Sequence, residues 1–393
     1  MEVPNRRPYL WFVTKKGTRM RQKVRIGIIG LGFGAEFIPI YQAHPHAELV
    51  AVCQRTEDSL HRIADHFGIA GRHTSVESML EDPDIDAVHI NSPIAAHAEH
   101  SIAALNAGKH VACTVPMATS VADCARIVRA QQDSCKSYMM METAVYTREF
   151  LYAKDLRDSG QLGRIQFLRG AHMQEMAGWP DYWLDLPPMH YATHAVAPLL
   201  ALAEREAESV RCLGSGRVDH AATRGGPPFA VETALFRLRD SDLAAEVTRS
   251  LFDVAREYVE SFDVYGDKMA YEWQQLERDS PVVFTGEDGR RVDIPDYADR
   301  LPAEIREYTT RGVYDADENR HLSFTQGSGH GGSHPHLAHE FVAAIVEGRA
   351  PFPDVYASAN WTSAGICAHE SALRGGAEIT LPLFSRSEVA VDA

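Results

Sequence analysis

The sequence predicts an α/β protein in two parts, an N-terminal parallel sheet flanked by helices and a C-terminal α+β part with an open, mainly antiparallel sheet. At 393 residues the chain is longer than one ordinary core supports. Short apolar segments alternate with helical ones as far as residue 142, which is typical of right-handed βαβ units. Beyond that point alternating segments come in pairs joined by tight turns, as in antiparallel hairpins.

In the N-terminal part, the first strand is expected at residues 23–30, where valine and isoleucine form one short apolar run. Strands and helices then alternate, and glycine follows two of the helices as a stop signal. The further strands are expected at 48–53, 85–90 and 110–114, and the helices at 56–67, 95–107 and 121–132.

In the C-terminal part, two helices are expected early and two late, with hairpins between them. The helices are predicted at 147–159, 189–203, 337–347 and 360–374. The hairpins are predicted to pair 231–239 with 243–251, 262–265 with 269–274, and 282–285 with 292–294.

Composition excludes several classes of protein. The formal net charge of -15 argues against nucleic acids and anionic membranes as partners. Six scattered cysteines without a C-x-x-C pair indicate reduced thiols, so we expect a cytoplasmic protein. Residues 1–22 are expected to be an extension, because the apolar run after Arg6 and Arg7 is shorter than an export signal requires. No apolar run is long enough to span a membrane.

A glycine-rich turn joins the first strand to the following helix. Gly30-x-Gly32-x-x-Ala35 lies where a dinucleotide fingerprint must lie, between a buried strand and a helix start. Gly30 permits the tight turn, Gly32 lets the backbone approach the pyrophosphate, and Ala35 is small enough for helix–strand packing. The sequence therefore predicts a Rossmann domain that binds a nicotinamide dinucleotide. The expected contacts at this turn are Gly30, Gly32, Phe33 and Gly34.

The end of the second strand leaves NAD and NADP both open. An acidic residue at this place usually binds the ribose hydroxyls. This chain has Gln54 and Arg55 there. Gln54 can still hydrogen-bond a hydroxyl, and Arg55 can pair with a 2′-phosphate or stack on adenine, or be a solvated surface charge.

Three further segments carry a resemblance to a known family. They are Asn91-Ser92-Pro93-x-x-x-His97, Ala107-Gly108-Lys109-His110-Val111 and the loop at Pro116. With the glycine turn, they resemble the Gfo/Idh/MocA family, which includes glucose–fructose oxidoreductase and inositol dehydrogenase. The resemblance implies NAD or NADP as cofactor, sugars or cyclitols as substrates, and homodimers or homotetramers formed through the open sheet. It also implies cofactor contacts at Asn91, Ser92, Pro93, His97, Thr114, Pro116 and Glu142.

The same resemblance implies a division of the chain. Residues 23–142 are expected to form the Rossmann domain, and residues 143–393 a domain for substrate binding and oligomerisation. The late helices within residues 337–374 are expected to pack back on the Rossmann domain.

One departure points to a particular branch of the family. Typical dehydrogenases of the family have Glu-Lys-Pro where this chain has Thr114-Val115-Pro116, and Val115 cannot take part in proton transfer as their lysine does. The NAD-dependent glycosidases of the family, typified by alpha-N-acetylgalactosaminidase, have valine there. They also resemble this chain at three other segments: Met140-Met141-Glu142, Tyr191-Ala192-Thr193-His194 and His330-Gly331-Gly332.

That resemblance implies Glu142, Tyr191 and His194 as catalytic groups. His172 falls near the position of a tyrosine that acts as a base in those glycosidases, and histidine is also a competent base. His194 is the preferred acceptor of the hydroxyl proton because its ordinary pKa lies near neutral pH. His190, four residues earlier, is expected on the same helical face, and Pro198 is expected to kink this helix. His190, His330 and His334 are expected to bind substrate.

A histidine cluster has the spacing of metal ligands. His334, His336 and His339 would suit zinc, but no metal is expected because the resembled family works through its nicotinamide. Pocket lining or simple packing are the alternatives for these side chains.

Three functions stay open from the sequence. The first is an oxidoreductase that acts on a ring hydroxyl, at C3, of a sugar or glycoside. The second is a redox-neutral glycoside hydrolase that oxidises C3, eliminates the C1 substituent, adds water and reduces C3 again. The third is a dinucleotide-sensing protein without turnover. The sugar, its anomer and the oligomer size are not encoded in any short motif.

Overall fold

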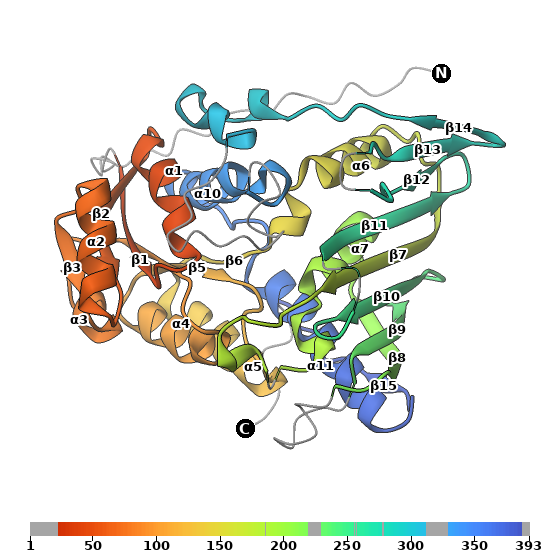
Figure 1. Ribbon diagram of the computed structural model, residues 1–393, viewed down its shortest axis with the longest axis horizontal. Coiled ribbons are helices and arrows are strands. Elements are labelled where there is room, and N and C mark those ends of the chain that lie inside the picture. Colours follow the sequence, from red (N-terminus) through yellow and green to blue (C-terminus); the bar gives the residue numbers. More distant parts are fainter. Residues whose placement is uncertain are drawn as a thin grey trace.

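The computed structural model describes residues 23–386 except 185, 219–228, 255, 257, 277–278 and 312–328, so the extension expected at residues 1–22 lies outside the described residues. Two sheets organise the described chain (Figure 1). The expected α/β fold with a parallel sheet and a second, mainly antiparallel sheet is confirmed. No helix in the described ranges is long and apolar enough to cross a bilayer.

The first sheet has six strands in the order β3-β2-β1-β4-β5-β6, all pairs parallel. Its strands are β1 (Val24–Ile29), β2 (Ala47–Cys53), β3 (Gly71–His73), β4 (Ala87–Ile90), β5 (His110–Thr114) and β6 (Tyr138–Met141). Successive strands are added toward one edge from β1 to β3 and toward the opposite edge from β4 to β6, so the order switches between β1 and β4. Ligands bind at such a switch point, beyond the carboxyl ends of the strands. Sequence patterning missed the short strands β3 and β6.

Helices cover both faces of this sheet (Figure 1). They are α1 (Ile38–Ala43), α2 (Glu57–Phe67), α3 (Val76–Leu80), α4 (His97–Asn106) and α5 (Val121–Ser134), and α10 (Gly329–Glu347) joins them from the far end of the sequence. Leu337 and Phe341 of α10 share one buried cluster with Ile26 and Ile28 of β1. Apolar burial therefore docks a late helix beside the glycine turn.

The second sheet has nine strands in the order β14-β13-β12-β11-β7-β10-β9-β8-β15. Only β7 and β10 among these neighbours pair in parallel, so the sheet is mixed but mainly antiparallel. Its strands are β7 (Ile165–Gln174), β8 (Ala207–Ser215), β9 (Val231–Leu238), β10 (Ala244–Ser250), β11 (Tyr258–Gly266), β12 (Ala270–Glu272), β13 (Val282–Thr285), β14 (Asp288–Arg291) and β15 (Ile379–Thr380). The helices α6 (Arg148–Asp158), α7 (Thr193–Ala203) and α11 (Val355–Leu373) lie between the two sheets (Figure 1).

Two expectations about this part were wrong. The last hairpin returns at Asp288–Arg291 and not at 292–294, because Thr285 pairs with Asp288 and Gly286 turns the chain with a φ of 64°. The helix expected at 189–203 begins only at Thr193, and residues Pro188–Tyr191 form a separate 3-10 turn. Pro188 at the start of that turn fixes the backbone φ there. The 3-10 turn ends at Ala192, before the helix begins.

Arg249 of β10 holds three segments together although it is fully buried. Its guanidinium donates to the Tyr191 carbonyl at 2.7 Å, to the His172 carbonyl at 3.1 Å and to Gln174 Oε1 at 2.9 Å, and also to the Ser250 carbonyl. Burial lowers the pKa of Arg249 to about 9, so it still carries its charge at neutral pH. Because His172, Gln174 and Tyr191 line the cavity described below, Arg249 positions one of its walls.

Replacing Arg249 by methionine is expected to lower the free energy of unfolding by about 3 kcal/mol or more, since each buried acceptor left without a donor costs about 1–3 kcal/mol. The midpoint of urea unfolding measures this loss. Arg237→Met, at an exposed position of the neighbouring strand β9, is the matched control and is expected to change the midpoint little. Equal midpoints for the two variants would show that Arg249 does not brace this wall.

Candidate active site between the two sheets

A cavity of about 1110 Å³, measured with its open mouth, lies between the two sheets at the carboxyl ends of β1, β4 and β5. One wall comes from the parallel sheet and the other from the second sheet with α7 and α10. The first wall includes Gly32, Phe33, Asn91, Ser92, His97, Thr114 and Val115, and the second includes His172, Gln174, Tyr191, His194, Tyr258 and His330. The glycine turn and the predicted proton-transfer groups therefore face one space.

The glycine turn has the geometry that the fingerprint requires. Gly30 has a φ of 86°, and a Cβ there would lie 2.4 Å from the Asn91 carbonyl oxygen. A Cβ at Gly32 would meet nothing within 4 Å, so its backbone is open to a ligand. Gly34 packs closely, because a Cβ there would lie 2.9 Å from Ile28 Cγ2. Gly30 and Gly34 thus allow close packing within the protein, while Gly32 is exposed toward the cavity.

Gln54 and Arg55 follow β2 beside this turn. Gln54 Oε1 accepts from the Leu31 backbone amide at 3.4 Å, and the Arg55 side chain is exposed. Neither is among the described residues that line the cavity. Their predicted contacts with the adenosine end of the cofactor stay a prediction.

His97 braces the two loops that follow β4 and β5. Its Nδ1 lies 2.7 Å from the Pro116 carbonyl oxygen and its Nε2 lies 2.8 Å from the Ser92 carbonyl oxygen. Both partners only accept, so both ring nitrogens must be protonated for both bonds to form. Burial disfavours the charged ring, but Cys113 and the two carbonyls together raise the pKa of His97 to about 9. The two loops that carry the lining residues Ser92 and Thr114 are thereby held in place.

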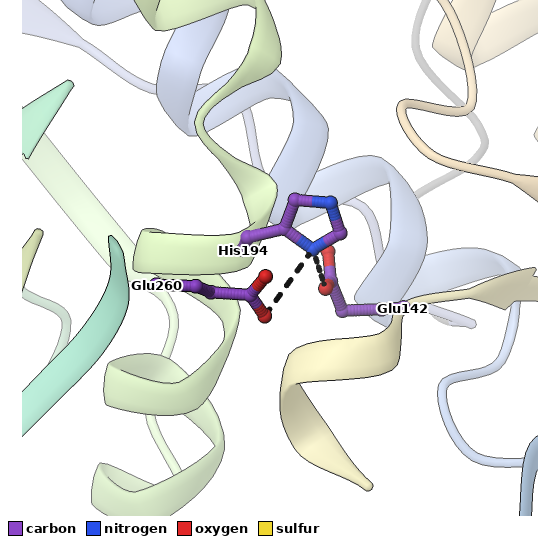
Figure 2. Close-up of side chains that lie close together, drawn as sticks. All are labelled: Glu142, His194 and Glu260. Carbon is purple, nitrogen blue, oxygen red and sulfur yellow. Dashed lines mark hydrogen bonds and ion pairs between the residues drawn. The ribbon is translucent and has the colours of Figure 1, made fainter. Parts of the chain in front are cut away.

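A buried pair joins the two walls: Glu142, which directly follows β6, and His194 of α7 (Figure 2). His194 Nδ1 lies 2.5 Å from Glu142 Oε1, which also accepts from the Ala144 amide at 3.0 Å. Because a carboxylate only accepts, Nδ1 donates to it and Nε2 is the nitrogen left for other partners. Tyr191 Oη lies 3.4 Å from that Nε2. The arrangement is that of a carboxylate-oriented imidazole base.

A second carboxylate approaches the same ring nitrogen of His194. Glu260 Oε1, from β11, is 3.8 Å from His194 Nδ1, and the other carboxylate oxygen accepts from Tyr258 at 2.8 Å (Figure 2). Burial alone would lower the pKa of His194, but Glu142 and Glu260 outweigh it and raise that pKa above its ordinary value. Burial also raises the pKa of Glu260.

Glu260→Gln is expected to shift the pH dependence of alcohol oxidation to lower pH. Oxidation needs His194 without its extra proton, and a nearby negative charge stabilises the protonated ring. Removing that charge lowers the pKa of His194, so the neutral base forms at lower pH. The measurement is the initial rate against pH, with Glu246→Gln on β10 as a matched control that should not move the profile. An unshifted profile for Glu260→Gln would rule out this electrostatic role.

These three residues also offer the donor atoms for a cation, since their ligand atoms lie within 4.8 Å of one another. The 2.5 Å separation of Glu142 and His194 is a hydrogen-bond distance, so a proton occupies the space that a metal would need. His334 and His339 have different partners instead of a common centre. His334 Nδ1 lies 3.3 Å from Glu36 Oε2, and His339 Nδ1 lies 3.0 Å from His44 Nε2.

The other predicted site histidines divide into two groups. His172 and His330 line the cavity, with ring centroids 5.1 Å and 6.4 Å from that of His194. His334 is fully buried behind His330, whose Nδ1 lies 3.1 Å from His334 Nε2. His190 contacts His369, with ring centroids 5.1 Å apart, and is not among the described lining residues. The inference that His190 and His194 share a helical face was wrong because the helix starts after His190.

Comparison with known proteins agrees with this geometry. Residues 24–141 match the model of a family described as "Oxidoreductase family, NAD-binding Rossmann fold", GFO_IDH_MocA. The parallel-sheet part of the chain is therefore similar to the Gfo/Idh/MocA family. The family resemblance is therefore confirmed, and with it the NAD-binding character of the domain.

This chain matches its curated relatives over only part of its own length and of theirs. A 1-carboxy-3-chloro-3,4-dihydroxycyclohexa-1,5-diene dehydrogenase from Comamonas testosteroni is 30% identical over 235 residues, 58% of either chain. A glycosyl hydrolase family 109 protein from Bacteroides thetaiotaomicron is 28% identical over 218 residues, 50% of this chain and 46% of that protein. The chain thus spans about half the length of the curated relatives that it matches, and the second name agrees with the glycosidase branch.

Solved structures share the whole fold. A levoglucosan dehydrogenase in complex with NADH and levoglucosan superposes with a TM-score of 0.75 at 22% identity, covering 92% of this chain and 100% of that one. At this identity the likeness shows the fold alone, in which a parallel-sheet domain is followed by an open sheet.

Sequence reasoning missed Glu260 because it belongs to no short motif. A signal was nevertheless available in β11. Successive side chains of a strand point to opposite faces of the sheet, so positions 258, 260, 262 and 264 share one face. Tyrosine, phenylalanine and valine occupy three of these positions, so a glutamate at the fourth is a charge on a buried face. A buried charge in such a place is a candidate for function.

Proposed function

We propose that this chain is an NAD-dependent oxidoreductase that removes hydride from a ring carbon, C3, of a neutral sugar or glycoside. The observation that carries the proposal is the buried Glu142–His194 pair, because it places a carboxylate-oriented imidazole in the same cavity as the glycine turn. The bound nicotinamide supplies the hydride acceptor, and His194 Nε2 takes the hydroxyl proton. Tyr191, next to Nε2, is proposed to hold the reacting hydroxyl.

The cavity wall supports an uncharged substrate. Among the described lining residues there is no lysine, arginine, aspartate or glutamate. The charged His97 ring already donates both of its N–H groups to backbone carbonyls, so a sugar phosphate or sugar acid would find no lysine or arginine in the wall to compensate its charge. Burying an unpaired charge is costly. Hydroxyl groups, by contrast, find hydrogen-bonding partners in Gln174, Tyr258 and Thr143.

The test is to incubate the purified protein and NAD with paired free sugars and glycosides, to identify products by mass spectrometry and to follow NADH absorbance. We expect a keto-sugar with an equal amount of NADH. Absence of product from every compound would contradict the proposal and favour a dinucleotide sensor.

A second candidate is redox-neutral glycoside hydrolysis, which is favoured by His172 beside His194 in the cavity. After oxidation at C3, the C2 hydrogen is acidic and His172 removes it as a proton. The C1 substituent then leaves with its bonding electrons, water adds across the double bond, and the hydride returns to C3. Released aglycone without net NADH, together with solvent deuterium at C2, would establish this cycle and overturn the first candidate.

We also propose a homo-oligomer formed through the second sheet. Leu213 of β8 and Leu235 of β9 are large apolar side chains that are 62% and 55% exposed. Contact between two copies would remove this apolar area from water. Light scattering on wild type and Leu235→Lys tests it, and a monomeric wild type would rule it out.

A further inference from the structure

Four aromatic rings continue outward from the proton-transfer groups. Trp179, Tyr182 and Trp183 lie on the segment that follows β7, and all three line the cavity with Tyr191. Ring centroids are 4.9 Å apart for Tyr191 and Trp183, 5.7 Å for Trp183 and Trp179, and 5.6 Å for Trp183 and Tyr182. Since Tyr191 contacts His194, the rings form an unbroken path from the base to the cavity mouth.

The exposure of these rings orders them from inside to outside. Trp183 is 6% exposed and packs in a buried cluster with Met176, Leu251 and Phe252. Tyr182, whose ring contacts that of Trp183, is 46% exposed. Trp183 is therefore the inner, buried ring of the group. Tyr182 is the outer ring and presents apolar surface to the solvent at the mouth. A ligand ring placed there would remove that surface from water.

The segment is held in this shape before any ligand binds. The Met176 amide donates to the Leu251 carbonyl at 2.8 Å, which ties the segment to the end of β10. The Trp179 amide donates to the Met176 carbonyl at 3.1 Å, and the Trp183 amide donates to the Pro180 carbonyl at 3.0 Å. Two successive turns thus fix the rings, so little conformational entropy is lost when a ligand stacks on them.

We infer that Trp179 and Tyr182 form a subsite for an uncharged aromatic group carried by the sugar, so that the substrate is an aryl glycoside. This inference rests on the proposed function, because the sugar ring must lie beside His194 for the aglycone to reach the mouth. No lysine, arginine, aspartate or glutamate lines the described part of the cavity, which agrees with a neutral aglycone. Offset or edge-to-face contacts between aromatic rings supply the attraction.

The experiment compares phenyl and methyl glycosides of the same sugars, using glucose, galactose, mannose and N-acetylgalactosamine. We expect wild type to turn over the phenyl member with a kcat/KM about three- to tenfold higher, the gain that one or two ring contacts supply. Trp179→Leu and Tyr182→Leu should remove this preference, so that the ratio of kcat/KM for the phenyl glycoside to that for the methyl glycoside falls to about one. Tyr182→Phe, which keeps the ring, should retain it.

Two controls separate the outcomes. Tyr265→Leu, on β11 and in contact with Phe167, removes a tyrosine that is not among the described lining residues, and should preserve the preference. Saturation-transfer NMR with phenyl glycosides and NAD reports binding without turnover. Equal kcat/KM for phenyl and methyl glycosides, or no transfer to the phenyl protons, overturns the subsite. Transfer that Trp179→Leu abolishes, without any turnover, supports the subsite and contradicts the proposed function.

Discussion

His194→Ala is expected to lower kcat for sugar oxidation by about 10²–10⁴-fold, the usual contribution of a positioned general base. The variant loses the nitrogen that accepts the hydroxyl proton, while the glycine turn and the loops braced by His97 stay in place. NADH affinity, measured by fluorescence titration, should therefore change little. A drop in kcat with unchanged cofactor affinity distinguishes lost chemistry from lost binding.

His190→Ala is the matched control for this experiment. It removes another histidine four residues earlier, which contacts His369 and not the described part of the cavity wall. Activity close to wild type is expected for it. If both alanine variants lost activity equally, the assignment of the base to His194 would fail. If neither did, proton transfer would have to be assigned elsewhere in the cavity.

Gly30→Ala is expected to destabilise the protein by about 3 kcal/mol or more and to abolish measurable dinucleotide binding. A φ of 86° is strained for any residue with a side chain, and strain of this kind costs about 1–3 kcal/mol. The new Cβ would also lie 2.4 Å from the Asn91 carbonyl oxygen, so the turn or the loop after β4 must move. Urea unfolding and NADH titration measure the two effects.

Gly32→Ala separates fold from binding at the same turn. A Cβ at Gly32 meets no protein atom within 4 Å, so stability should be close to that of wild type. The side chain would project where the turn faces the cavity, and NADH affinity should fall. Stable protein with full NADH affinity would show that the dinucleotide does not approach this turn.

The sequence alone determined those features that depend only on residues adjacent in the chain, such as the glycine turn and a hairpin. A strand, a tight turn and a helix start are contiguous, so Gly30, Gly32 and Ala35 predicted the dinucleotide site without any knowledge of the fold. Period-two alternation likewise located the β9–β10 hairpin within a residue or two. The resemblance of Glu142, Tyr191 and His194 to a glycosidase pattern added candidates, and the structure brings these three together.

Only the tertiary structure decided what depends on long-range approach. Glu142 and His194 are 52 positions apart, and their 2.5 Å contact exists because the turn that follows β6 packs against α7. Glu260 joins them from β11 and changes the electrostatics of the base, although no motif contains it. His190 and His194 look equivalent in the sequence, yet a 3-10 turn directs one toward His369 and the helix α7 directs the other into the cavity. Proton affinity depends on the charges and burial around a group in space, and spacing along a chain does not specify either.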